Sequence, residues 1–81
     1  MEAKAQISIL IAELDVADTF EVDDQSHLHV GHANSGKGHY RIRLIGLKDP
    51  SIKRIELHRL IYDKLSHLLA TSVHALKIEV I

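Results

Sequence analysis

Hydrophobic and polar residues follow two different periods in the first half of the chain. Over residues 2–15, apolar side chains recur every three or four positions, which predicts an amphipathic helix. Over residues 19–23 and 39–45, apolar and polar residues alternate, which predicts two strands that each have one buried and one solvated face. Residues 24–38 have no such period and are rich in glycine and histidine, so we expect a loop. The two strands should therefore form a hairpin with an unusually long connection.

A helical period returns in the second half of the chain. Asp49-Pro50-Ser51 is typical of a helix start, and the apolar positions that follow keep helical spacing as far as residues 70–71. These positions are Leu57, Leu60, Ile61, Leu65, Leu68 and Leu69. We expect a break around residues 53–56 to divide the region into a short helix and then a longer one. Alternation over residues 73–81 predicts a third strand.

The expected element order is α-β-β-α-α-β, in a single domain that covers residues 1–81. A helical connection from the second strand to the third favours parallel pairing with a right-handed crossover. The sequence therefore predicts an α+β fold: a three-stranded mixed sheet with helices on one face and the other face open.

Composition narrows the possible functions. None of the 81 residues is cysteine, which excludes disulfides, a thiol nucleophile and a thiolate metal site within the chain. A net charge of −1 does not indicate general nucleic-acid binding. No apolar run approaches the roughly 20 residues of a membrane span, and nothing resembles a signal peptide, so we expect a cytoplasmic protein without membrane association. With no acid/base pair and no nucleophile motif, we do not expect an enzyme.

Four segments resemble one known family. Arg-Ile-Glu-Leu-His-Arg-Leu-Ile-Tyr at 54–62 and Val-His-Ala-Leu-Lys-Ile at 73–78 are similar to the signature of the BolA family. The Asp-x-Ser-x-x-His pattern at 24–29 and Gly-His-Tyr-Arg-Ile at 38–42 resemble the same family. The resemblance implies a fold similar to a type II KH domain, without the GxxG loop that binds nucleic acid. It also implies a partnership with a monothiol glutaredoxin in iron–sulfur cluster handling.

Histidine is the remaining candidate ligand, with seven in the chain. By the resemblance, His74 corresponds to the family's shared cluster ligand and His29 to its loop ligand, and His32 would replace His29 if the loop alignment shifts. A [2Fe–2S] cluster needs four ligands, and imidazole can supply two of them. We therefore expect a cluster only in complex with the glutaredoxin and glutathione, and a monomer or weak homodimer without it.

Each histidine also has a simpler interpretation. His74 could be hydrogen-bonded at a strand end, and a loop histidine could be merely solvated. The spacing His27-x-His29-x-x-His32 could capture zinc or nickel adventitiously. His58 is expected to help fix its helix on the sheet by hydrogen bonding rather than to act directly.

The alternative function is that of a DNA-binding transcriptional regulator of stress response and cell morphology, which some bacterial members of the BolA family are described as. Basic side chains on the open sheet face and at the start of the second helical region could contact phosphates. The candidate cations are Arg41, Arg43, Lys53, Arg54 and Arg59. Against this, Glu21 and Asp23 on the neighbouring strand can pair with the two sheet arginines.

Overall fold

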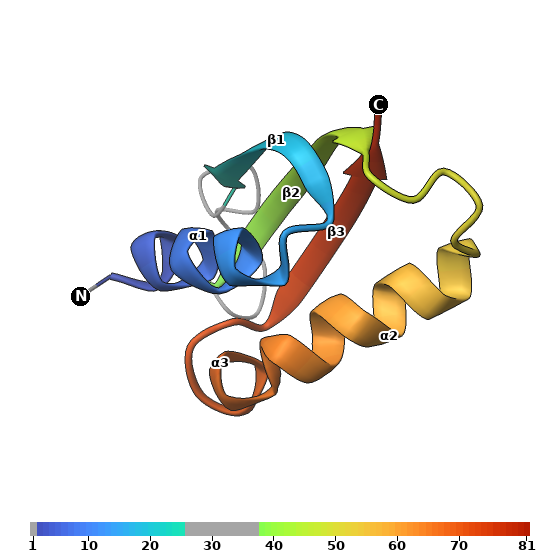
Figure 1. Ribbon diagram of the computed structural model, residues 1–81. Helices are drawn as coiled ribbons and strands as arrows, with labels where there is room; N and C mark the ends of the chain where they lie inside the picture. Colours follow the sequence, from blue (N-terminus) through green and yellow to red (C-terminus); the bar gives the residue numbers. More distant parts are fainter. Residues whose placement is uncertain (1, 26–37) are drawn as a thin grey trace.

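The computed structural model describes residues 2–25 and 38–81, which form an α+β fold with the expected element order (Figure 1). The elements are α1 (Ala3–Leu14), β1 (Ala17–Asp24), β2 (His39–Leu47), α2 (Arg54–Lys64), α3 (Ser66–Thr71) and β3 (Ala75–Val80). No helix in the described part of the chain is long and apolar enough to cross a membrane.

The three strands form one mixed sheet in the order β1-β2-β3. β1 and β2 are antiparallel, with Val22 opposite Ile42, and β2 and β3 are parallel, with Ile42 opposite Ile78. The parallel pair follows from the connection through α2 and α3, because a helical crossover returns the chain to the same end of the sheet. The predicted mixed sheet is confirmed.

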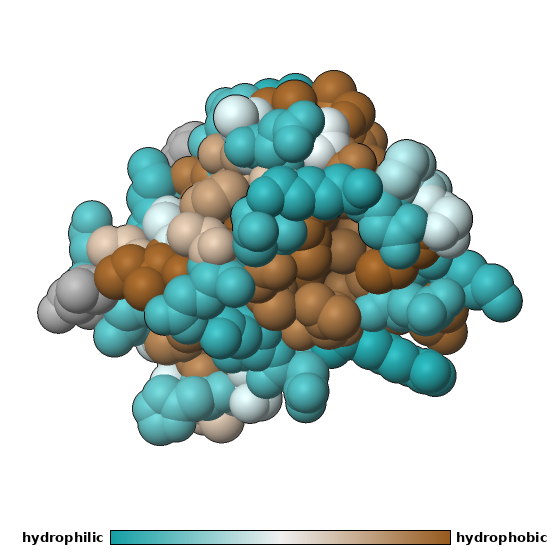
Figure 2. Space-filling model, viewed as in Figure 1, coloured by the Kyte–Doolittle hydropathy of each residue, from teal (hydrophilic) through white to brown (hydrophobic). Residues whose placement is uncertain are grey.

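The core lies between one face of this sheet and the helices. Ile42 and Leu44 are fully buried on the central strand, as are Ile7 of α1 and Ile61 of α2. These side chains meet because alternation places the apolar residues of a strand on one face of the sheet, and helical spacing places those of a helix on the side that faces the sheet. The face viewed in Figure 2 is hydrophilic over much of its area, with apolar side chains gathered near its middle.

The helical region after β2 differs from the prediction. The break falls at Leu65 rather than around residues 53–56, so the longer helix comes first. Asp49 does not cap α2. Its carboxylate accepts hydrogen bonds from the Ser51 amide at 3.1 Å and from the Ser51 hydroxyl at 2.6 Å. Because these bonds close a local turn, α2 begins later, at Arg54.

The third strand begins two residues later than expected. The Val73 N–H donates to the carbonyl of Leu68 in α3, at 2.8 Å, and the Val73 side chain is 1% exposed. Val73 therefore closes the helix and fills the core, and β3 starts only at Ala75.

Candidate functional site

His74 lies in the short connection between α3 and β3. Its side chain is exposed, whereas the preceding Val73 is buried in the core. The His74 N–H donates to the Gly38 carbonyl at 2.9 Å, and the Ala75 N–H donates to the same oxygen at 3.1 Å. The backbone of His74 is thus tied to the sheet on one side and to α3 on the other, while its imidazole is accessible to a partner.

Gly38 is the residue against which His74 packs. It is buried and has a φ of +76°, a conformation that residues with a Cβ rarely adopt. A Cβ there would lie 2.7 Å from Cδ2 of the His74 ring and 2.7 Å from the Ser72 carbonyl oxygen. In the sequence, Gly38 stands out only as the first residue of the Gly-His-Tyr-Arg-Ile motif. Its position directly before an alternating strand was the one available signal.

The two loop candidates, His29 and His32, lie outside the described residues. The ends of the segment that contains them are described. The Gln25 N–H donates to the His39 carbonyl at 2.8 Å, and Gly38 accepts from His74. Both ends are therefore anchored where β2 begins, next to His74. Within residues 2–25 and 38–81, no group of three or more His, Cys, Asp or Glu side chains could hold a metal ion.

His58 lies on α2, where its ring stacks on Tyr62 with a centroid separation of 6.4 Å and an interplanar angle of 6°. The Tyr62 hydroxyl in turn donates to the Leu76 carbonyl on β3 at 3.2 Å. Tyr62 therefore links α2 to β3, the strand that follows His74, and the His58 ring packs on the Tyr62 ring. The hydrogen bond that links α2 to the sheet therefore comes from the Tyr62 hydroxyl.

The two sheet arginines are engaged by carboxylates on both neighbouring strands. Arg41 contacts Asp23 at 2.5 Å and Glu79 at 3.6 Å, and Arg43 lies 3.7 Å from Glu79 and 4.0 Å from Glu21. Hydrogen bonding to Arg41 lowers the pKa of Asp23 below its ordinary value, and the same bond raises the pKa of Arg41. The expected pairing across the hairpin is confirmed.

The other basic candidates, Lys53, Arg54 and Arg59, are exposed at or near the start of α2. They belong to the helical layer, whereas Arg41 and Arg43 lie on the open face of the sheet, so the five candidates are divided between two layers. DNA binding stays a prediction.

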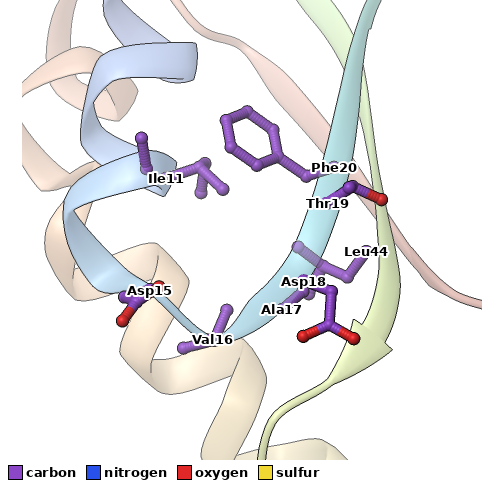
Figure 3. A pocket seen from close by; sticks show the side chains of 9 residues that line it. Ile11, Asp15, Val16, Ala17, Asp18, Thr19, Phe20 and Leu44 are labelled. Atoms are coloured by element: carbon purple, nitrogen blue, oxygen red, sulfur yellow. The ribbon is translucent and has the colours of Figure 1, made fainter.

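A pocket between the end of α1 and β1 lies outside this arrangement (Figure 3). Ile11 and Phe20 provide apolar walls, and Asp15 and Asp18 contribute carboxylates. None of the histidines or cations singled out above lines it.

Comparison with known proteins identifies the family. A family model described as BolA-like protein matches residues 10–81. This chain belongs to the BolA family. A bolA-like protein of Caenorhabditis elegans is 41% identical over 64 residues, which are 75% of this chain and 56% of that protein. SufE-like protein 1, chloroplastic/mitochondrial, of Arabidopsis thaliana is 36% identical over 73 residues.

The match to SufE-like protein 1 covers 82% of this chain but only 19% of that relative, so the chain corresponds to a small part of the larger protein. The solved BolA domain of SufE1 from Arabidopsis thaliana superposes with a TM-score of 0.78 and 29% identity, covering 99% of this chain and 92% of that one. The BolA-like fold therefore extends over nearly the whole chain.

Proposed function

We propose that this protein is the partner of a monothiol glutaredoxin, and that His74 together with His29 or His32 ligates a [2Fe–2S] cluster bridged between the two proteins. The observation that carries the proposal is the exposed His74 imidazole on a backbone anchored at both sides. Membership in the BolA family supports it, as does the relative whose name, SufE-like, is associated with iron–sulfur biology.

The ligand chemistry fits a shared cluster and not a cluster held by this chain alone. Four ligands are needed, usually thiolates, and imidazole can replace two of them. The chain has no cysteine, so two histidines are the most that it would contribute. The partner's cysteine and the thiol of glutathione would then supply the other two positions.

The rigidity of the His74 backbone is a second argument. A ligand held in place before binding loses less conformational entropy than one on a free loop. The N–H groups of Val73 and His74 are both hydrogen-bonded, to Leu68 and Gly38 respectively. His74 is thus suited to receive a cluster delivered on another protein.

The test compares two histidine variants in a titration of cluster-loaded monothiol glutaredoxin, followed by visible absorption and circular dichroism. His74→Ala should abolish the spectral change that the unaltered protein produces. His67→Ala is the matched control, because His67 is also exposed but lies on α3 and lacks the contact with Gly38. If His74→Ala gives the same spectrum and affinity as His67→Ala, the proposal is wrong.

A further inference from the structure

The absence of a side chain at residue 38 brings two segments into direct contact. Besides the His74 ring carbon and the Ser72 carbonyl oxygen, the His74 backbone nitrogen would lie 2.9 Å from a Cβ at this position. Two of these three atoms belong to the backbone, which is hydrogen-bonded on both sides and has little freedom to move. The space is therefore available only while residue 38 is glycine.

Gly46 provides an internal comparison. It has a similar φ of +71°, but the three atoms nearest to a Cβ there would all belong to the Asp18 side chain, with Oδ2 at 2.6 Å. A carboxylate on a flexible side chain can rotate aside, whereas the backbone at residues 72–74 cannot. Alanine at either glycine would incur backbone strain of the same kind, but only alanine at 38 would press on His74.

We infer that Gly38 is a positioning residue for His74: its missing side chain seats the imidazole against the start of β2 and sets the direction in which the ring faces a partner. The geometry stands without the proposed function, but its consequence for the cluster rests on that function. Any L-residue with a Cβ at 38 displaces the ring, so the ligand is mispositioned although His74 itself is unchanged.

The first test is made on the protein alone, by NMR. In the unaltered protein, a nuclear Overhauser effect should connect a Gly38 Hα with His74 Hδ2, and its absence would overturn the inference whether or not any variant folds. In Gly38→Ala, the His74 ring resonances should shift while those of His58 and His67 stay in place. In Gly46→Ala, all three should stay in place. Unshifted His74 resonances in folded Gly38→Ala, or equal shifts in both variants, would also overturn it.

The second test repeats the titration with cluster-loaded glutaredoxin. Gly38→Ala should lose or alter the spectrum of the bridged cluster, and Gly46→Ala should retain it. A normal spectrum for Gly38→Ala contradicts the positioning role. Failure of the unaltered protein to form any bridged cluster contradicts the proposed function instead, and leaves the NMR result to decide the role of Gly38.

Discussion

The guanidinium of Arg41 on β2 contacts the carboxylate of Asp23 on β1 through two nitrogens, with Nη2 at 2.5 Å and Nε at 3.1 Å from the same oxygen. The two residues are directly opposite in the antiparallel register. Glu79 on β3 lies on the other side of Arg41. The open face of the sheet therefore balances much of its own charge, which leaves these arginines less available to phosphates.

Removing the Asp23 carboxylate should make stability less dependent on pH. Arg41 holds the pKa of Asp23 below its ordinary value of 3.8, so the unfolded chain takes up this proton at higher pH than the folded protein. The stabilisation by the Asp23–Arg41 pair is fully present above pH 3.8, the ordinary pKa. It is lost as the pH falls through the lower pKa of Asp23 in the folded protein. Asp23→Asn should therefore be less stable than the unaltered protein near neutrality, and the difference should shrink in acid.

Urea unfolding at several pH values measures this effect. Glu21→Gln is the control, because Glu21 is more exposed and lies 4.0 Å from Arg43, so its loss should matter less. Added salt should reduce the Asp23 effect, since the pair is only partly buried. A difference that grows as the pH falls would contradict the assignment.

Loss of the Tyr62 hydroxyl should weaken the attachment of α2 to β3. Tyr62→Phe removes the hydrogen bond to the Leu76 carbonyl, and a bond of this kind contributes about 0.5–1.5 kcal/mol. We expect a loss in the lower half of that range, because Tyr62 is 41% exposed. Tyr40→Phe is the matched control: its hydroxyl has no hydrogen bond to another described residue, and burial raises its pKa. Equal losses of unfolding free energy in the two variants would refute the proposed link.

Glycine at residue 15 should stabilise the protein. Asp15 ends α1 with a φ of 54° and a ψ of 43°, in the left-handed region. Relief of about 1–2 kcal/mol of backbone strain there exceeds the roughly 0.4–1 kcal/mol by which glycine stabilises the unfolded chain. Asp15→Gly also loses the exposed ion pair with Lys48, which is worth only about a few tenths of a kcal/mol. The net gain should be about 0.5 kcal/mol in thermal or urea unfolding.

Lys48→Met separates the two contributions, since it removes the ion pair but keeps the left-handed aspartate. It should be slightly destabilising. If Asp15→Gly loses as much stability as Lys48→Met, strain at residue 15 does not limit the stability of α1.

The loop ligand can be identified by substituting the three candidate histidines one at a time. His29→Ala should abolish the spectrum of the bridged cluster if His29 is the ligand, whereas His32→Ala should do so if the shifted alignment holds. His27→Ala is the control and should retain the spectrum. Retention in all three variants would mean that this segment provides no ligand, and His74 would then be the chain's only contribution.

The fold could be predicted from the sequence to the extent that local periods determine it. Alternation in residues 39–45 marked the central strand, and the helical spacing from Leu57 to Leu69 marked the second helical region, because burial on one face imposes these periods. The position of the helix break could not be predicted, because the burial of Leu65 depends on core contacts with other elements. Asp49-Pro50-Ser51 has the same composition whether it caps a helix or closes a turn.

The sequence by itself determined the family, the mixed sheet, the absence of thiolates and the candidate role of His74. Only the tertiary structure decided how His74 is held. Gly38 and His74 are far apart in the chain. The reason for glycine at residue 38 is visible only in the fold, where the backbone has a positive φ and a Cβ would collide with Ser72 and His74. The pattern of apolar residues predicts which side chains are buried. It does not predict at which glycine a Cβ would collide with a residue distant in the chain.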